Sequence, residues 1–264
     1  MKLFYVTLLV LVFSCKSNNE TKVPEKVIVE KTTFDAIHGN ITDFKTITFP
    51  SKDGLTITAD LYLVKEPKDF ILLCHQADFS RGEYIEAAKK LNKLGYSCMA
   101  IDQRSGKIAN NIPNETAKLA IEKGIKLKSY LEAKIDIEAA IDYFYKMNDN
   151  TPMIIVGSSY SASLSLLLAV NNTKIKAIAA FSPGEYLEGL NLANAILDLK
   201  KPVFVTSSKK EIEGVAVIIE NVKSINKVHF KPEVKGIHGS RVLWKKTLGN
   251  EKYWKAFTNF LDSL

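Results

Sequence analysis

Short apolar runs alternate with amphipathic helical stretches along most of this 264-residue chain, and that alternation constrains its fold more than any other feature. The apolar runs lie at residues 70–74, 97–101, 153–156, 175–181, 202–206 and 227–230. Helical periodicity lies between and after them, at residues 83–94, 130–147, 160–170, 187–199, 215–225 and 253–264. Strands that are apolar on both sides must be covered on both faces. The pattern therefore predicts an α/β fold, with a mostly parallel sheet between two layers of helices.

Two segments that precede these runs have a different period. Residues 41–49 and 55–64 alternate between apolar and polar side chains, and Lys52, Asp53 and Gly54 form a turn signal between them. A period of two is typical of strands that bury one face, and a short turn joins antiparallel strands. We therefore expect an antiparallel hairpin at the N-terminal edge of the sheet, which brings the expected sheet to eight strands.

One connection is longer than a crossover between strands needs. Residues 105–128 contain Pro113 and a helical stretch at 115–123 that ends at Gly124. Long connections at this end of a parallel sheet often cover functional sites, but they also occur as plain surface insertions. Position alone leaves both interpretations open.

The N-terminus has the pattern of a targeting segment. Lys2 precedes an almost unbroken apolar run at residues 3–13, which is too short to span a bilayer, and Ser14 and Cys15 follow it. Residues 12–15, Val-Phe-Ser-Cys, resemble the lipobox of a bacterial lipoprotein signal peptide. The resemblance implies cleavage before Cys15, lipid attachment to Cys15 and a membrane-anchored lipoprotein of the bacterial cell envelope. The alternative is a plain secretory signal. On the first interpretation the signal peptide is residues 1–14, a polar tether spans 15–40, and the folded domain spans 41–264.

Charge and cysteine usage exclude several classes of function. The net charge is +7, but the 36 Lys and Arg residues form no block and no aromatic-basic motif, so we expect no nucleic-acid partner. Cys74 and Cys98 lie inside apolar runs and are expected to be small buried residues rather than a disulfide. His, Cys and carboxylate residues show no metal-ligand spacing, so we expect neither a metal nor another cofactor.

The strongest chemical signal is the Gly-Ser-Ser-Tyr-Ser sequence at residues 157–161, between an apolar strand and a helix. A nucleophile elbow typically has this setting, with a serine that has a small residue two positions before it and another two positions after it. Ser159 would be the nucleophile, and the amide of Tyr160 at the helix N-terminus could stabilise an oxyanion. Ser161 stands where glycine is usual. The alternative is a serine that only caps the helix.

A serine hydroxyl needs a base, and the base needs an acid behind it. Among the four histidines, only His238 lies in a loop that follows the serine, which fits the chain order of serine, acid and histidine. The acid is expected after the apolar run 202–206, where Glu211 is our choice and Glu213 the alternative.

From about residue 45 to its end, the chain resembles the α/β-hydrolase superfamily, in particular its dienelactone-hydrolase-like and small-esterase members. Three further segments carry the resemblance: Leu72 to Ala77 resembles the His-Gly loop, Asp102 to Gly106 an Asp-x-Arg-x-Gly turn of structural role, and Asp136 to Phe144 the helix before the elbow. The resemblance implies the eight-stranded α/β-hydrolase fold and a second oxyanion amide from Ala77, with Gln76 as second choice.

It also implies a serine hydrolase that cleaves a carboxylic ester through an acyl-enzyme, with a small-molecule ester or an acylated glycan as substrate. A peptidase or thioesterase of the same fold, or a non-catalytic envelope lipoprotein that kept the fold, are the alternatives.

Overall fold

The computed structural model describes residues 44–264. The expected signal peptide at residues 1–14, Cys15 and the tether at 15–40 lie outside the described residues, as do His38 and the first residues of the expected hairpin. No helix among the residues described combines the length and hydropathy needed to cross a bilayer.

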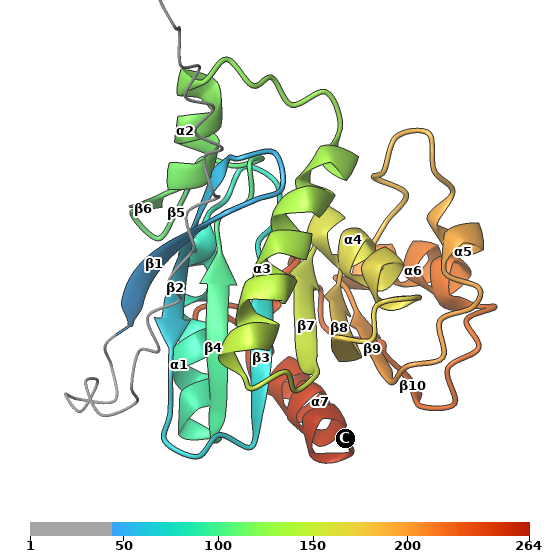
Figure 1. The fold of residues 1–264 in the computed structure, drawn as a ribbon. Helices are drawn as coiled ribbons and strands as arrows, with labels where there is room; N and C mark the ends of the chain where they lie inside the picture. Colours follow the sequence, from blue (N-terminus) through green and yellow to red (C-terminus); the bar gives the residue numbers. More distant parts are fainter. Residues whose placement is uncertain (1–43) are drawn as a thin grey trace, which may run out of the picture. The chain divides into compact units, whose positions relative to one another are not determined.

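The sheet has eight strands in the order β1-β2-β4-β3-β7-β8-β9-β10 (Figure 1). Their bounds are Lys45–Pro50 (β1), Thr56–Tyr62 (β2), Asp69–Cys74 (β3), Tyr96–Ile101 (β4), Met153–Ser158 (β7), Ile175–Phe181 (β8), Val203–Thr206 (β9) and Lys227–Phe230 (β10). β2 pairs antiparallel with β1 and with β4, and every other neighbouring pair in this sheet is parallel. The predicted hairpin and the mostly parallel eight-stranded sheet are confirmed.

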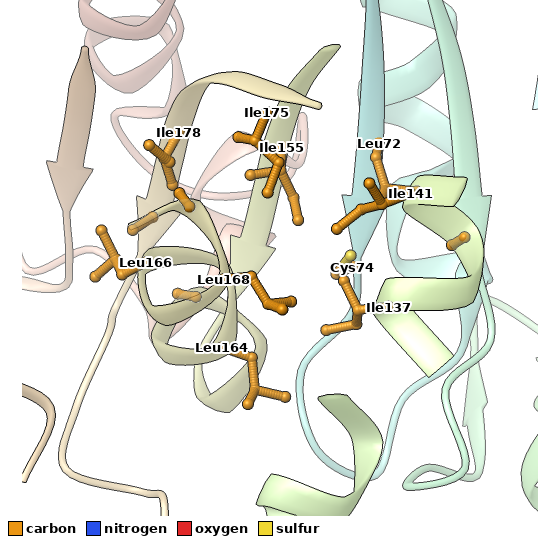
Figure 2. Close-up of a cluster of buried hydrophobic side chains, with 14 of the residues drawn as sticks. Leu72, Cys74, Ile137, Ile141, Ile155, Leu164, Leu166, Leu168, Ile175 and Ile178 are labelled. Carbon is orange, nitrogen blue, oxygen red and sulfur yellow. The ribbon is translucent and has the colours of Figure 1, made fainter. Parts of the chain in front are cut away.

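Helices cover both faces of this sheet, as the apolar strands require. α3 (Lys134–Met147), α4 (Tyr160–Ala169) and α6 (Ile212–Ile219) contribute buried side chains to the hydrophobic cluster on one face. α1 (Ile85–Lys93) and α7 (Asn250–Asp262) pack on the other face (Figure 1). Figure 2 shows part of the first cluster, in which side chains of β3 and β7 meet Ile137 and Ile141 from α3 and Leu164 and Leu168 from α4.

Cys74 and Cys98 are buried, free thiols on adjacent strands. Cys74 pairs with Ile101 and Cys98 with Ile71, so the register keeps the two residues apart along the β3–β4 pair. Burial raises the pKa of both thiols. They are small core residues, as the sequence predicted.

Two predicted helices differ from the structure. The expected helix at 187–199 is wrong, since only one turn forms there, α5 (Leu192–Ala195). The carboxylate of Glu185 accepts the amides of Leu192 and Ala193, and Gly189 has a φ of +76°, so a loop occupies the first half of the segment.

The expected helix at 215–225 starts and ends earlier than predicted. A 3₁₀ turn, η4 (Lys209–Glu211), leads into α6, which ends at Ile219. The ammonium group of Lys227 binds the carbonyls of Ile219, Glu220 and Val222, which stabilises a turn in place of further helix. Two other helices begin with a 3₁₀ turn, η2 (Arg81–Tyr84) before α1 and η3 (Tyr130–Ala133) before α3.

The long connection at 105–128 folds into a two-stranded pair and one helix. β5 (Ile108–Ala109) pairs with β6 (Ile112–Pro113), and α2 (Glu115–Glu122) follows. Asn114 caps α2 by accepting the amide of Ala117, and the carboxylate of Asp102 accepts the amide of Glu115. The segment is therefore anchored to the end of β4; its role as a lid stays a prediction.

Two ion pairs of the Arg104 side chain fix the turn after β4. The guanidinium of Arg104 donates to both carboxylate oxygens of the buried Asp136 on α3, and also to the partly exposed Asp53 in the hairpin turn (2.8 Å). These bonds connect the turn after β4 to α3 and to the turn of the β1–β2 hairpin.

Candidate active site

Ser159 lies at the corner between β7 and α4 in a conformation that non-glycine residues rarely adopt. Its φ is 58° and its ψ is −124°, and its amide donates to the carbonyl of Phe181 (2.8 Å). The corner depends on Gly157, because an added Cβ there would lie 2.4 Å from the carbonyl oxygen of Ser161 and 2.6 Å from the Cα of Ala162. A sharp strand-to-helix turn thus carries the serine, as the motif predicted.

The serine side chain does not cap the helix. Ser159 occupies the N-cap position of α4 but makes no side-chain capping bond. The capping alternative is therefore contradicted, and the hydroxyl is free to bind elsewhere. Ser161, which replaces the usual glycine, is fully buried and donates to the carbonyl of His75, so a hydroxyl is accommodated there with a partner.

His238 lies between the serine and a carboxylate. Its Nε2 is 2.7 Å from the Oγ of Ser159, and its Nδ1 hydrogen-bonds Oε1 of Glu211. Glu211 follows β9 at the end of η4, while Glu213 lies exposed on the first turn of α6. The structure brings Ser159, His238 and Glu211 together and leaves Glu213 out.

The second oxygen of Glu211 has three donors of its own. Oε2 accepts the amide (3.0 Å) and hydroxyl (2.7 Å) of Ser208 and the hydroxyl of Ser182 (2.9 Å). Partial burial pushes the pKa of Glu211 up, but the hydrogen bonds from His238, Ser208 and Ser182 outweigh it and bring the pKa down to about 2. Since the carboxylate is ionised, Nδ1 of His238 carries the ring proton and Nε2 can accept the proton of Ser159.

The other described histidines have different surroundings. His75 is completely buried; its Nε2 accepts the amide of Gln103 (3.0 Å) and its Nδ1 donates to the carbonyl of Gln76 (2.7 Å). Burial lowers the pKa of His75 to about 4, so the ring is neutral and links two loops. His229 lies on β10, half-buried, and burial lowers its pKa as well.

Two backbone amides near Ser159 have no acceptor among the described residues. Tyr160 is the first residue of α4, so its amide has no partner within the helix. The Ala77 amide likewise makes no hydrogen bond within residues 44–264. The amide of Gln76, the second choice from sequence, already donates to Glu83 (2.8 Å). Of these two amides, that of Ala77 is the one available to a ligand.

Glu83 is a residue to which the sequence assigned no role. It is fully buried, and its carboxylate accepts the Gln76 amide and the hydroxyls of Ser158 (2.8 Å) and Ser240 (2.6 Å). In turn, the Ser158 hydroxyl accepts the amide of Ser240 (2.8 Å). Burial raises the pKa of Glu83, and the hydrogen bonds from Ser240, Gln76 and Ser158 oppose that shift.

The three partners of Glu83 come from three loops of the site. Gln76 precedes Ala77, Ser158 precedes the serine at the corner, and Ser240 follows the histidine by two residues. One carboxylate therefore holds the three loops in register. In the sequence it cannot be told from an exposed acidic residue at the start of a helix, which is why it was missed.

Gln76 replaces the glycine that is usual in the His-Gly loop, and its side chain lies against Gly239. A Cβ on Gly239 would be 2.6 Å from Oε1 of Gln76 and 2.5 Å from Oγ of Ser158, and the φ of Gly239 is +75°. The glycine beside the histidine thus makes room for the glutamine.

The described residues bring no three His, Cys, Asp or Glu side chains together as a candidate metal site.

Comparison with known proteins supports the fold. No family model matches the sequence, and no curated protein matches it. An esterase from Pyrococcus furiosus matches in structure with a TM-score of 0.66 and 16% identity, over 84% of this chain and 91% of its own. A dienelactone hydrolase from Anabaena variabilis matches with a TM-score of 0.66 and 12% identity, over 85% of this chain and 99% of its own. Est1E from Butyrivibrio proteoclasticus, solved with ferulic acid, matches with a TM-score of 0.62 and 16% identity, over 82% of this chain and 98% of its own. The chain has the α/β-hydrolase fold, as predicted.

The buried carboxylate leads to a stability prediction. Glu83→Gln should lower the free energy of unfolding by about 1–3 kcal/mol, because an amide cannot accept all three hydrogen bonds and leaves a buried group unpaired. Urea denaturation followed by circular dichroism measures the change. Glu122→Gln, at an exposed position on α2, is the control and should stay within about 0.5 kcal/mol of the unmodified chain. Equal stability of the two variants would contradict the role of Glu83.

Proposed function

We propose that this chain is a serine hydrolase that cleaves a carboxylic ester through an acyl-enzyme. The observation that carries the proposal is the continuous line from the Ser159 hydroxyl through His238 to an ionised Glu211. A hydroxyl that donates to a neutral imidazole, with an anion behind the ring, is the arrangement that makes serine nucleophilic at neutral pH.

In the first half-reaction, Ser159 Oγ attacks the ester carbonyl while Nε2 of His238 takes its proton. The negative charge that develops on the carbonyl oxygen would be stabilised by the amides of Tyr160 and Ala77. Nε2 then gives the proton to the leaving alkoxide, the carbon–oxygen bond of the ester breaks, and an acyl group remains on Ser159. While the His238 ring holds two protons, Glu211 stabilises its positive charge.

In the second half-reaction, water replaces the alcohol. Nε2 of His238 takes one proton from the water as its oxygen attacks the acyl carbon, and it returns that proton to Oγ of Ser159 as the acyl bond breaks. The carboxylic acid leaves and the enzyme regains its first state. The cycle consumes one water and uses no metal or other cofactor.

An ester is preferred over an amide or a thioester because similar structures carry the names esterase and dienelactone hydrolase. The fold alone does not choose among acyl substrates. A small-molecule ester or an acylated glycan is the substrate class that we propose, and a peptidase, a thioesterase or a non-catalytic protein of this fold are outcomes that the tests below distinguish.

We further propose that the enzyme is a lipoprotein of the bacterial cell envelope, anchored in the membrane through Cys15. The support is the sequence alone: an apolar run at residues 3–13 that ends at a lipobox-like Val-Phe-Ser-Cys. Several acyl chains on one cysteine give firm membrane binding, since each buried CH₂ contributes about 0.8 kcal/mol.

A fluorophosphonate probe tests the nucleophile. The unmodified chain should be labelled at Ser159, and Ser159→Ala should abolish the labelling because the hydroxyl is the attacking group. Ser263→Ala, at an exposed serine after α7, should label normally. A folded sample that does not label would favour the non-catalytic alternative, and a labelled protein that turns over peptides or thioesters but no ester would correct the substrate class.

The acid is tested by a matched pair of variants. Glu211→Gln should lower kcat for a short-chain ester by on the order of a thousandfold, because the ring loses the anion that orients and stabilises it. Glu213→Gln, two residues away and exposed, should leave kcat within about twofold. Steady-state kinetics on the two variants decides the matter, and equal losses would reject Glu211 as the acid.

The Glu211→Gln variant should also change how the free energy of unfolding depends on pH. The pKa of Glu211 is about 2 in the folded chain and 4.5 for an unperturbed glutamate, so its ionised form stabilises the fold above pH 4.5, and that stabilisation is lost as the pH falls toward 2. The difference in unfolding free energy between the unmodified chain and Glu211→Gln should narrow over this interval. Urea denaturation of both proteins across this interval measures the difference, and a difference that does not narrow would contradict the ionised state of Glu211.

Lipid attachment is tested in a bacterial host fed an alkyne-labelled fatty acid. The full chain should incorporate the label and sediment with membranes, because Cys15 carries the acyl chains. Cys15→Ser should lose both properties, whereas Cys74→Ser, inside the folded domain, should keep the label. A label that survives Cys15→Ser would contradict the anchor.

A further inference from the structure

Two tyrosine side chains line a cavity, and one of them, Tyr186, contacts the ring of His238. The cavity measures about 410 Å³ and lies between residues 127–130, at the end of the long connection, and the loop after β8; its lining residues are Leu127, Lys128, Ser129, Tyr130, Tyr186 and Glu188. Tyr130 and Tyr186 are each 36% exposed, so both rings are accessible to a ligand.

The ring of Tyr130 is fixed from behind. It stacks on the ring of Tyr160, with 4.6 Å between centroids and 22° between planes. Tyr160 is itself buried, and its hydroxyl accepts from the amide group of Gln103 (2.8 Å) and bonds to Ser105. One face of Tyr130 is therefore covered and held. Tyr160 directly follows Ser159 in the chain, so the residue that supports Tyr130 is also the first residue of the helix after the nucleophile.

Tyr186 approaches the site from the histidine side. Its ring meets that of His238 edge to face, with 6.3 Å between centroids and 85° between planes. Gly184 lets the ring lie close to the backbone, since a Cβ there would be 2.4 Å from Cζ of Tyr186. Burial and the charge of Glu211 raise the pKa of Tyr186, while the hydroxyl of Ser159 lowers it, as expected of a phenol beside the nucleophile.

A second cavity also borders Tyr130. It measures about 470 Å³ and has Leu127 and Tyr130 in its lining, together with Ala117, Ala120 and Ile121 of α2. The free space adjacent to Tyr130 is therefore larger than the first cavity alone. Aromatic rings gain from offset-stacked and edge-to-face contacts beyond the burial of their area, which alkyl chains do not.

We propose that the cavity between Tyr130 and Tyr186 is the substrate subsite for an aromatic ring, carried by the ester on its acyl or its alcohol side. The inference rests on the proposed function and adds the class of substrate to it. The long connection then has a part in the site, since it supplies Leu127 and Lys128 of the wall and leads into Ser129 and Tyr130.

Binding to the Ser159→Ala variant tests the subsite without turnover. Cinnamate, an aromatic acid, should bind at least about tenfold more tightly than octanoate, measured by calorimetry. Tyr130→Ala in the same background should remove that preference, and Tyr130→Phe should keep it because the ring is retained. Tyr145→Ala, a tyrosine on α3 outside both cavities, is the control and should behave like the parent. Equal binding of the two acids by the parent, or a preference that survives Tyr130→Ala, overturns the acyl-side subsite.

Kinetics on the active chain separates the two sides of the ester. Methyl cinnamate against methyl octanoate probes the acyl side, and benzyl acetate against hexyl acetate probes the alcohol side. We expect a kcat/KM preference of about tenfold for the aromatic member in one arm, lost in Tyr130→Ala mainly through KM. No preference in either arm, in a chain that the fluorophosphonate labels, rejects the subsite alone. A chain that the fluorophosphonate does not label rejects the proposed function. The subsite is then decided by binding alone: cinnamate is compared with octanoate for the acyl side, and benzyl alcohol with hexanol for the alcohol side.

Discussion

The backbone conformation of Ser159 is the constraint on which the rest of the site depends. A non-glycine residue with positive φ costs on the order of 1–3 kcal/mol, so the surrounding structure has to hold it there. The hydrogen bond from the Ser159 amide to the Phe181 carbonyl and the close approach of Gly157 to α4 do so. The result is a hydroxyl that stands clear of the helix, makes no capping bond and meets an imidazole from a loop far along the chain.

Two carboxylates act on the loops around this hydroxyl, and their environments differ. Glu211 is partly exposed and surrounded by hydrogen-bond donors, and its pKa of about 2 keeps it ionised at neutral pH. Glu83 is fully buried behind the site, where burial raises its pKa and where it joins the serine, histidine and Gln76 loops. The first orients a ring that has to change its charge, and the second holds loops whose relative positions have to stay constant.

Local signals were sufficient for much of the fold and for the choice of Ser159, His238 and Glu211. The period of the apolar residues fixed the strands and their alternation with helices, and chain order selected His238 and Glu211 once Ser159 was found at its corner. The segment at 187–199 failed because a carboxylate seven residues before Leu192 and a left-handed glycine interrupt a pattern that reads as helical. Glu83 could not be found, since its partners are distant in sequence and only folding brings them together.

The contact between Gln76 and Gly239 constrains how this chain can change in evolution. With a long side chain at position 76, a side chain at position 239 has no room, and the positive φ adds a conformational penalty of its own. Shortening residue 76 relieves only one of two close contacts, because the same Cβ would still lie 2.5 Å from Oγ of Ser158, and the backbone penalty stays. Oγ of Ser158 is in turn bonded to Glu83 and to the Ser240 amide. Gly239 is therefore fixed by two loops at once and is the more constrained of the two positions.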